Sequence, residues 1–213
     1  MLLIDKPKGM TSHDVVDVVR RATGERRVGH AGTLDPNATG LLIVGVGREE
    51  TRKLEELTRN TKKTYVADIY LGEERDTDDI EGKVVSTSEV KPDLEEVKKV
   101  MLEFVGEQEQ TPPQYSAVKV GGKKAYELAR GGKEVKIKPK KITIYKADIL
   151  SYKYPTLKVE FEVSSGTYIR SIAHDLGRKL GSFGYLKDLR RTKIGEFSVD
   201  TAKSLEEIKQ LQQ

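Results

Sequence analysis

Helices are predicted along the chain wherever apolar residues recur three or four positions apart. The clearest case begins at Thr11 or Ser12, either of which can cap a helix by accepting a backbone N–H, and ends at Gly24. Between these ends, Val15 and Val19 belong to one apolar stripe. Apolar spacing or flanking turn residues predict further helices over 49–57, 93–104, 123–130 and 168–180, and from Ser204 onward.

Strands are predicted where apolar residues alternate with polar ones or form a short continuous run. Residues 41–46 form such a run, which is typical of a strand buried on both faces. Residues 142–150 and 157–163 are expected to pair through a turn over 152–155. The other candidates are 2–4, 65–71, 84–85 and part of 186–198. Because strands and helices interleave without a regular βαβ order, we predict an α+β fold with a mixed or antiparallel sheet.

The length and composition narrow the class of protein. The chain of 213 residues shows no internal repeat, low-complexity tract or long linker, so we expect a single domain over 1–213. No apolar run approaches the length of a membrane span, and the N-terminus lacks the pattern of a signal peptide. The absence of cysteine excludes disulfides, thiolate catalysis and cysteine metal sites. A cytoplasmic location is therefore predicted.

Charge is distributed unevenly, although the net charge is only +4. Residues 118–146 carry ten Lys or Arg against two Glu, whereas residues 73–96 carry ten acids against three bases. Such asymmetry suggests one side that faces a polyanion and another that is solvated. A lysine-rich face that merely keeps the protein soluble remains the alternative at this point.

Several kinds of site find no support in the sequence. His13, His30 and His174 have no neighbouring ligand residues at metal spacing, so no metal is expected. Neither a phosphate-binding P-loop nor a Gly-x-Gly-x-x-Gly turn after a strand is present, so no nucleotide cofactor is expected. A Ser-His-Asp triad stays open, but nothing resembles a nucleophile elbow.

The segment Gly-His-Ala-Gly-Thr-Leu-Asp-Pro-Asn-Ala-Thr-Gly over 29–40 contains one acid, Asp35, among turn-forming residues. The segment is either an ordinary turn or a loop that presents a catalytic carboxylate. A catalytic Asp must stay ionised, and Arg170, at the start of a predicted helix, is a candidate cation. Tyr65, at the start of a predicted strand, could stack on a flat substrate. A packing role for Tyr65 and a surface role for Arg170 are the alternatives.

A series of motifs in one order resembles the TruB family of tRNA pseudouridine synthases. The motifs span nearly the whole chain, and together they are far more specific than any one alone. They are Asp5-Lys-Pro-Lys-Gly-Met-Thr-Ser12, Gly29-His-Ala-Gly-Thr-Leu-Asp-Pro36, Ala38-Thr-Gly40, Lys63-x-Tyr65, Gly72-x-x-x-Asp-Thr-x-Asp79, Pro112-Pro-x-Tyr-Ser-Ala117, Gly122-Lys-Lys-x-Tyr126, Gly166-Thr-Tyr-Ile-Arg170, Asp175-Leu-Gly177 and Leu189-Arg-Arg191.

The resemblance implies a pseudouridine-synthase catalytic domain, with a mixed, largely antiparallel central sheet flanked by helices. It implies an isomerase that converts uridine 55 in the T loop of tRNA to pseudouridine after flipping the base, with no cofactor or metal. Attack of the aspartate at C1′ of the sugar or at C6 of the base stays open. The expected partner is the T arm of tRNA, and we expect a monomer that needs no protein partner and no membrane.

The resemblance also assigns roles to residues. Asp35 matches the catalytic aspartate, Tyr65 the tyrosine that stacks on the target base, and Arg170 the arginine that pairs with the aspartate. Further matches are His30, which fills the space vacated in the T loop, Leu189, which lines the pocket, Lys6, which supports the catalytic loop, and Gly32 and Thr33 beside it. As RNA-backbone contacts we expect Lys119, Lys123, Lys124, Lys133, Lys136, Lys138, Lys140, Lys141, Arg190 and Arg191.

The pattern departs from the family at the C-terminus. Members usually continue into a small RNA-binding domain of the PUA type, and we expect this chain to lack one. Two alternatives to a stand-alone tRNA enzyme therefore stay open. One is a pseudouridine synthase directed by a guide RNA, and the other is an RNA-binding or tRNA-folding module of the same fold.

Overall fold

The computed structural model describes residues 1–58, 61–131 and 135–210. Contacts within the chain group it into two compact units. The first unit is formed by Met1–Val66 together with Leu189–Gln213, and the second by Ala67–Asp188. The chain thus leaves the first unit after Val66 and returns at Leu189. The prediction of one domain over 1–213 stays a prediction, and each unit is described separately.

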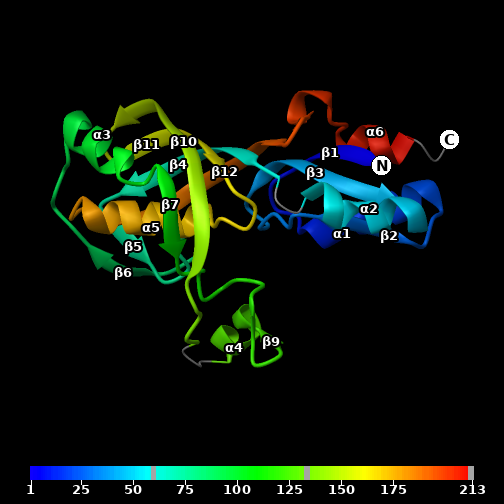
Figure 1. Cartoon of the computed structure of the whole chain (residues 1–213), viewed down its shortest axis with the longest axis horizontal. Coiled ribbons are helices and arrows are strands. Elements are labelled where there is room, and N and C mark those ends of the chain that lie inside the picture. The colour runs from blue at the N-terminus through cyan, green and yellow to red at the C-terminus, as the bar shows by residue number, and fades with distance from the viewer. Residues whose placement is uncertain (59–60, 132–134, 211–213) are drawn as a thin grey trace. The chain divides into compact units, whose positions relative to one another are not determined.

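The first unit is built around strand β3 (Thr39–Val46), which Figure 1 shows with helices α1 (Ser12–Thr23) and α2 (Arg48–Thr58). β1 (Leu2–Lys6) and β2 (Val28–Ala31) both run antiparallel to β3, whereas β12 pairs with it in parallel. The remaining elements of this unit are the start of β4 (Lys63–Leu71), the end of β12 (Gly184–Ile194), β13 (Phe197–Ser198), the 3-10 turn Val199–Thr201 and α6 (Leu205–Lys209).

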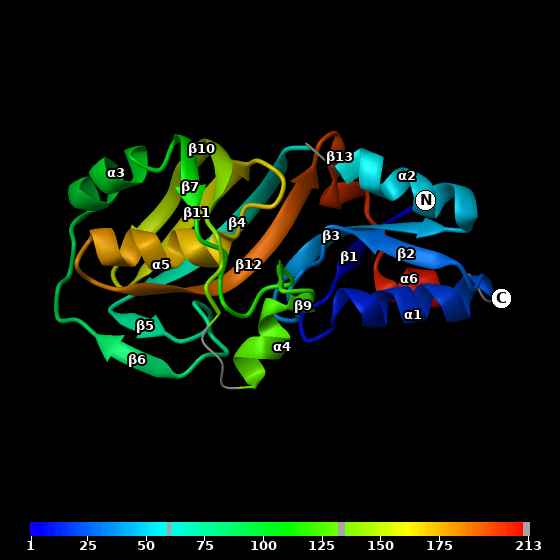
Figure 2. The same ribbon diagram turned by 60° about the horizontal axis from the view of Figure 1, so that its bottom comes forward.

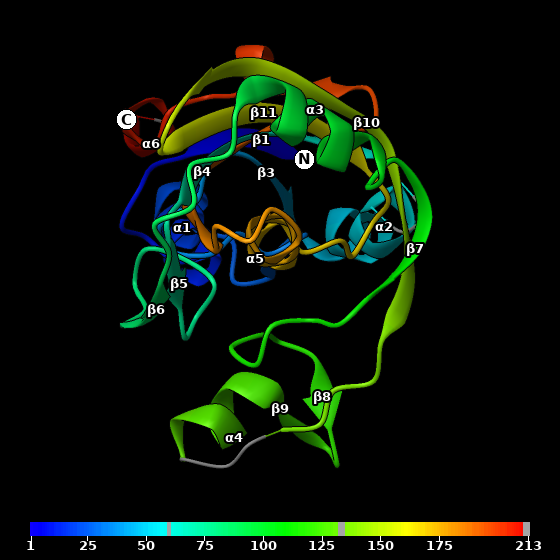
Figure 3. The ribbon, with the colours of Figure 1, turned by 90° about the vertical axis from the view of Figure 1, so that its left-hand side faces the viewer.

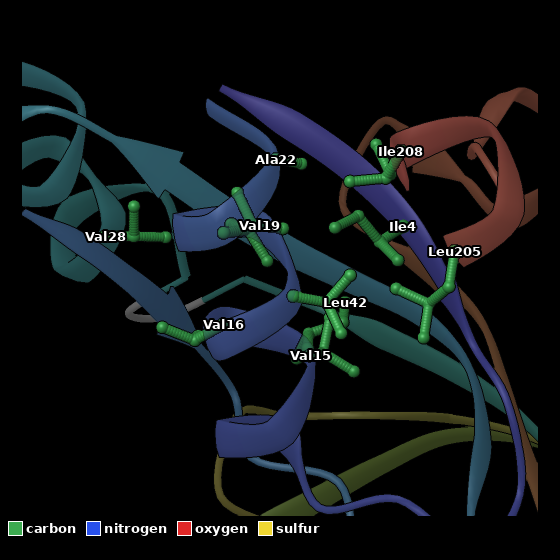
Figure 4. Close-up of a cluster of buried hydrophobic side chains, with 11 residues drawn as sticks. Ile4, Val15, Val16, Val19, Ala22, Val28, Leu42, Leu205 and Ile208 are labelled. Atoms are coloured by element: carbon green, nitrogen blue, oxygen red, sulfur yellow. The ribbon is translucent and has the colours of Figure 1, made fainter. Parts of the chain in front are cut away.

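The predicted double-sided burial of β3 is confirmed. Leu41 and Leu42 are fully buried, and they belong to two different apolar clusters. Leu42 packs with Ile4 and the apolar face of α1, and Figure 4 shows these side chains converging with those of α6. Leu41 packs with Leu54 of α2 instead. Each such side chain contributes about 1.5–3 kcal/mol on burial, so this strand anchors the loops at both of its ends.

The second unit contains most of the antiparallel strands. In order across the sheet they are β12, β4, β11 (Thr156–Val163), β10 (Lys140–Lys153) and β7 (Gly106–Gln110). Helix α5 (Ile169–Lys179) lies against one face of these strands in Figure 2, with Ile172, Ala173 and Leu176 buried. The other elements are β5 (Glu73–Arg75), β6 (Val84–Thr87), α3 (Leu94–Leu102), β8 (Lys119–Val120), β9 (Lys123–Lys124) and α4 (Ala125–Arg130).

The short hairpin β8–β9 and helix α4 lie beyond the ends of β7 and β10, away from the strands of the main sheet, as Figure 3 shows. The two strands pair antiparallel around Gly121 and Gly122. Both glycines have positive φ (59° and 85°), a backbone conformation that residues with a Cβ rarely adopt. This glycine pair, which lies just before the helix predicted over 123–130, therefore forms the turn of a hairpin.

The predicted α+β class and largely antiparallel sheet are confirmed. β2 and β7 were not predicted, because their sequences, VGHA and GEQEQ, lack an apolar alternation. Each forms by pairing with a longer strand, β2 with β3 and β7 with β10. The loop predicted over 29–40 therefore begins as a strand, and its irregular part is confined to 32–38.

Candidate active site

The loop between β2 and β3 presents Asp35 from a tight turn. The carbonyl of Asp35 accepts a hydrogen bond from the N–H of Ala38 at 3.0 Å, with Pro36 and Asn37 between them. Asp at the first position and Pro at the second are the favoured residues of such a turn. The turn and the catalytic interpretations of this segment are thus compatible, because a turn is what holds the carboxylate at the end of the loop.

Three groups of the β1–α1 segment hold the loop on either side of Asp35, and two of them, Ser12 and Lys6, are buried. Ser12 Oγ accepts the N–H of Leu34 at 2.9 Å and donates to its carbonyl at 3.1 Å. The carbonyl of Pro36 accepts both the Lys6 amine, at 3.1 Å, and the N–H of Gly9, at 2.9 Å. The residues before and after Asp35 are therefore each fixed to the β1–α1 segment.

Lys6 is fully buried, and its ammonium group donates to three carbonyls. They belong to Pro7 at 2.9 Å, Met10 at 2.6 Å and Pro36 at 3.1 Å. Burial lowers the pKa of Lys6 to about 8, although the negative charge of Asp35 opposes this. The bond to Pro36 attaches Lys6 to the loop, and its loop-supporting role in the reaction stays a prediction. The burial of Lys6 leaves no exposed amine for contact with a substrate in this conformation.

Arg191 is 1% exposed and holds the start of the same loop. Its Nη2 donates to the carbonyl of Gly32 at 2.7 Å, and its Nε donates to the carbonyl of Leu41 at 2.8 Å. The guanidinium carbon also lies 6.0 Å from the centre of the Tyr65 ring, within the range of a cation–π interaction. One buried cation thus brings the Asp35 loop and Tyr65 into the same neighbourhood.

The predicted RNA contact at Arg191 is wrong for this conformation, because its guanidinium is buried and bonded to the protein backbone. Arg190, one position earlier on β12, is partly exposed and forms two hydrogen bonds with Asp5, at 3.0 and 2.8 Å. Successive side chains of a strand point to opposite faces. Two adjacent arginines of one motif therefore have different environments, and only Arg190 remains a candidate for phosphate.

The other predicted residues of the first unit lie near the loop or on the adjoining strands. His30, on β2, is half-buried, and burial lowers its pKa below the ordinary value for histidine. Its Nε2 lies 3.4 Å from the hydroxyl of the exposed residue Thr33. Tyr65 is 7% exposed, and Leu189 is partly buried with its carbonyl 3.4 Å from the Thr39 hydroxyl. A neutral imidazole suits packing against an RNA base better than pairing with phosphate.

Arg170 lies in the first turn of α5, in the second unit, and is 6% exposed. Its guanidinium donates to Asp79 Oδ2 at 3.3 Å, to the carbonyl of Thr77 at 3.3 Å and to the carbonyl of Tyr115 at 3.0 Å. Asp79 in turn accepts the Thr77 hydroxyl at 2.6 Å. Arg170 is thus a buried residue whose guanidinium is fixed by three hydrogen bonds, rather than a surface residue.

Sequence reasoning gave Ser12 only as a possible helix cap and assigned no role to Asp79. Both belong to motifs that resemble the TruB family, Asp5–Ser12 and Gly72–Asp79. Their position in those motifs was the sequence signal that could have identified them as functional residues. A third case is Gln110, which is 3% exposed. Its side-chain amide accepts the N–H of Tyr168 at 2.8 Å and donates to its carbonyl at 3.0 Å, just ahead of Arg170.

The expected phosphate contacts of the second unit differ in their exposure to solvent. Lys119, Lys123 and Lys124 are exposed on the β8–β9 hairpin, and the register places Lys119 directly opposite Lys124. Like charges in that arrangement repel, and an anion between them would relieve the cost. Lys140 is partly buried, donates to the carbonyl of Gly166 and lies 4.5 Å from the centre of the Tyr168 ring. Lys136, Lys138 and Lys141 are exposed, and Lys133 lies outside the described residues.

Two searches of the structure bear on metal and membrane. Among residues 1–58, 61–131 and 135–210, no group of three or more His, Cys, Asp or Glu could hold a metal ion. Within the same ranges no helix is long and apolar enough to cross a membrane.

The chain is similar to known proteins over almost its whole length. It is 50% identical over 208 residues to tRNA pseudouridine synthase B of Aquifex aeolicus, covering 97% of this chain and 72% of that protein. It is 48% identical over 200 residues to the protein of the same name from Protochlamydia amoebophila, covering 94% and 76%. Among solved structures, a chain of a Cbf5–Nop10–Gar1 complex matches with a TM-score of 0.75 and 29% identity, over 96% of this chain and 52% of that one. This chain thus spans about half the length of that solved chain.

Two family models match adjoining parts of the chain. The model of the TruB family pseudouridylate synthase N-terminal domain matches residues 20–169, and that of the tRNA pseudouridylate synthase B C-terminal domain matches residues 170–213. The first model includes Asp35 and Tyr65, and the second begins at Arg170. On this evidence, together with the close relatives above, the chain belongs to the TruB family of pseudouridylate synthases.

Proposed function

We propose that the chain isomerises uridine 55 in the T loop of tRNA to pseudouridine, with Asp35 as the nucleophile and without cofactor or metal. The observation that carries the assignment of Asp35 is its anchoring. The residue on each side of Asp35 is hydrogen-bonded to buried groups of the β1–α1 segment, through Ser12 and Lys6. The relatives named tRNA pseudouridine synthase B support the reaction and the RNA class.

The reaction breaks the bond between N1 of uracil and C1′ of the sugar and forms a bond from C5 to C1′. The proton lost from C5 is balanced by one gained at N1, so no redox partner is required. A carboxylate assists by bonding at C1′ or at C6 while the ring rotates. Such a carboxylate must remain ionised, and we propose that Arg170 stabilises it by pairing with Asp35.

The surrounding residues take supporting roles in this proposal. Tyr65 stacks on the flipped uracil, an interaction worth roughly 1–3 kcal/mol per base. His30, with its lowered pKa, enters as a neutral ring the space that the flipped base leaves. Leu189 lines the pocket, and the backbone at Gly32 and Thr33 approaches the RNA closely. The exposed lysines of the β8–β9 hairpin bind phosphates of the T arm.

We further propose a cytoplasmic monomer that needs no protein partner and works as a single domain. One observation favours a second candidate function. The likeness to a chain of a Cbf5–Nop10–Gar1 complex is consistent with a protein-assisted or guided enzyme. The identity to that chain is 29%, compared with 50% to the Aquifex aeolicus protein, so the stand-alone enzyme is favoured.

The test is a turnover assay on an unmodified tRNA transcript and on an isolated T-arm hairpin, without guide RNA, protein partner or added metal. We expect pseudouridine at the T-loop uridine of both RNAs. Asp35→Asn should abolish the product and leave the Kd for RNA within a fewfold of the unaltered chain. Asp17→Asn, at a half-exposed acid on α1, is the control and should retain full activity.

Product formation by Asp35→Asn would overturn the role of Asp35. Tight binding by the unaltered chain without product on either RNA would favour the guided enzyme or a tRNA-folding module. Adding Nop10-like and Gar1-like proteins with a guide RNA would then separate those two.

A further inference from the structure

Ser12 bonds to both backbone groups of one residue in the Asp35 loop. It is the first residue of α1 and is 2% exposed. Its hydroxyl accepts the N–H of Leu34 at 2.9 Å and donates to the carbonyl of Leu34 at 3.1 Å. A hydroxyl carries one donor and two acceptor positions, so this side chain satisfies both groups at once.

The hydroxyl of Ser12 is not needed to cap its own helix. Thr11 is the N-cap of α1, and its side chain accepts the N–H of Asp14 at 3.1 Å. Asp14 completes the cap by accepting the N–H of Thr11 at 2.7 Å. The two adjacent hydroxyl residues thus have separate roles. Thr11 caps the N-terminus of α1, and Ser12 holds a loop residue that lies 22 positions further along the chain.

Leu34 is itself 4% exposed, so its peptide groups are shielded from water together with the Ser12 hydroxyl. A buried hydrogen bond that loses one partner leaves the other partner unsatisfied, and the local backbone then moves to find water. The backbone that would move here is the residue immediately before Asp35. On the other side of Asp35, the carbonyl of Pro36 stays bonded to Lys6 and Gly9.

We propose that Ser12 is a positioning residue for the reaction, which fixes the direction of the Asp35 carboxylate by holding Leu34. The inference rests on the proposed function, because it assumes that Asp35 is the nucleophile. A nucleophile displaced by about 1 Å from its reacting carbon loses on the order of 100-fold in rate. Because Ser12 is only 2% exposed, its loss is expected to act on the chemical step and not on RNA binding.

The test compares Ser12→Ala with Thr11→Ala. Both variants remove one hydroxyl from the start of α1, but only the first removes bonds to the Asp35 loop. We expect Ser12→Ala to lower the single-turnover rate on the T-arm hairpin at least about tenfold, with Kd unchanged within about twofold. We expect Thr11→Ala to lose stability in urea denaturation and to keep a rate within about twofold of the unaltered chain.

Hydrogen exchange supplies a readout that does not depend on catalysis. The Leu34 amide should exchange faster in Ser12→Ala, while the Val16 amide inside α1 should not change. If Asp35→Asn remains active, the proposed function fails, yet the exchange result still reports whether Ser12 holds the loop. Faster exchange at Leu34 with an unaltered rate would overturn the positioning role.

A second result would also overturn the positioning role. If Ser12→Ala and Thr11→Ala lose the same stability and the same rate, the loss of rate comes from a weakened α1 and not from the Asp35 loop. Should Ser12→Ala fail to fold, Ser12→Cys serves in its place. The thiol fills a similar volume but donates and accepts hydrogen bonds weakly. The same loss of rate at constant Kd is expected for that variant, and an unaltered rate would reject the proposal.

Discussion

At the scale of single residues, buried charge is the main feature of this chain. Lys6, Arg170 and Arg191 are 0%, 6% and 1% exposed, and each donates to backbone carbonyls of an irregular segment. Burying a cation costs free energy unless hydrogen bonds compensate for the lost hydration. Breaking those hydrogen bonds leaves an uncompensated buried charge. Each of these residues therefore holds a loop in one position more strictly than an apolar side chain would.

Asp78 gives a prediction for the dependence of stability on pH. It is partly buried next to Asp79 in the turn that holds Arg170, and this burial raises its pKa from 3.8 to about 6. His174 and Arg170 oppose this rise, whereas Asp175 and Asp79 add to it. Because the folded state binds this proton more tightly, the contribution to stability is present at acid pH and is lost as pH rises through about 6.

At about pH 7.5, Asp78→Asn should therefore unfold at a higher urea concentration than the unaltered chain. The difference between the two midpoints should vanish towards about pH 4. Asn tolerates the positive φ of this position, 60°, as well as Asp does. Asp17→Asn, at a half-exposed position, should show little change at either pH. A less stable Asp78→Asn at about pH 7.5 would mean that His174 and Arg170 outweigh the cost of burial.

At the scale of elements, α5 shows how packing overrides local preference. Glycine in the interior of a helix is less favourable than alanine by about 1 kcal/mol, yet α5 contains Gly177. A Cβ at this position would lie 2.2 Å from the backbone nitrogen of Gly184 and 2.2 Å from the carbonyl carbon of Phe183. The helix thus packs directly on the backbone that begins β12, and only glycine leaves room for that approach.

Gly177→Ala should therefore destabilise the chain by about 1–3 kcal/mol or more, against the gain of about 1 kcal/mol that helix preference predicts. Urea denaturation followed by circular dichroism gives the difference in the free energy of unfolding. Gly131→Ala is the control, because a Cβ there would lie 3.3 Å from the carbonyl of Leu128, at a φ of −80°. We expect it to change stability by less than about 0.5 kcal/mol. Equal effects at the two glycines would refute the packing argument.

At the scale of the whole molecule, the structure shows which elements the basic and the acidic segments of the sequence form. Part of the basic segment 118–146 forms the β8–β9 hairpin, where Lys119, Lys123 and Lys124 are exposed. Part of the acidic segment 73–96 forms β5, the turn that holds Arg170, and β6. The acidic residues in that turn are thus structural, whereas the hairpin lysines are available to a polyanion.

Replacing Lys119, Lys123 and Lys124 together by Gln should weaken binding of the T-arm hairpin and reduce its salt dependence. Each lysine–phosphate pair that the substitutions remove lowers the slope of log Kd against log salt by about 0.7–0.9, so removing all three pairs lowers it by about 2–3. The control replaces Lys83, Lys99 and Lys153, three exposed lysines of the same unit, by Gln, with the same change in net charge. If both triple variants alter the slope equally, the hairpin has no specific role.

The sequence alone was sufficient to predict most of the helices and strands and to identify the family. Periodicity located α1, α3, α5 and strands β3, β4, β10 and β11, because each buries its own apolar face. The strands β2 and β7 were missed, since they have no such face and form only when a neighbouring strand supplies hydrogen bonds. Motif spacing likewise identified Asp35, Tyr65 and Arg170 as candidates without showing what holds them.

Only the tertiary structure decided which charged residues face solvent and which hold loops. Arg190 and Arg191 are adjacent and chemically identical in the sequence, yet Arg191 is buried against Gly32 and Leu41 while Arg190 pairs with Asp5 at the surface. The physical reason is that strand alternation separates neighbours onto two faces, and only the packed sheet determines which face is covered. The same holds for Ser12, whose partner Leu34 lies 22 residues away in the chain and meets it only in the folded protein.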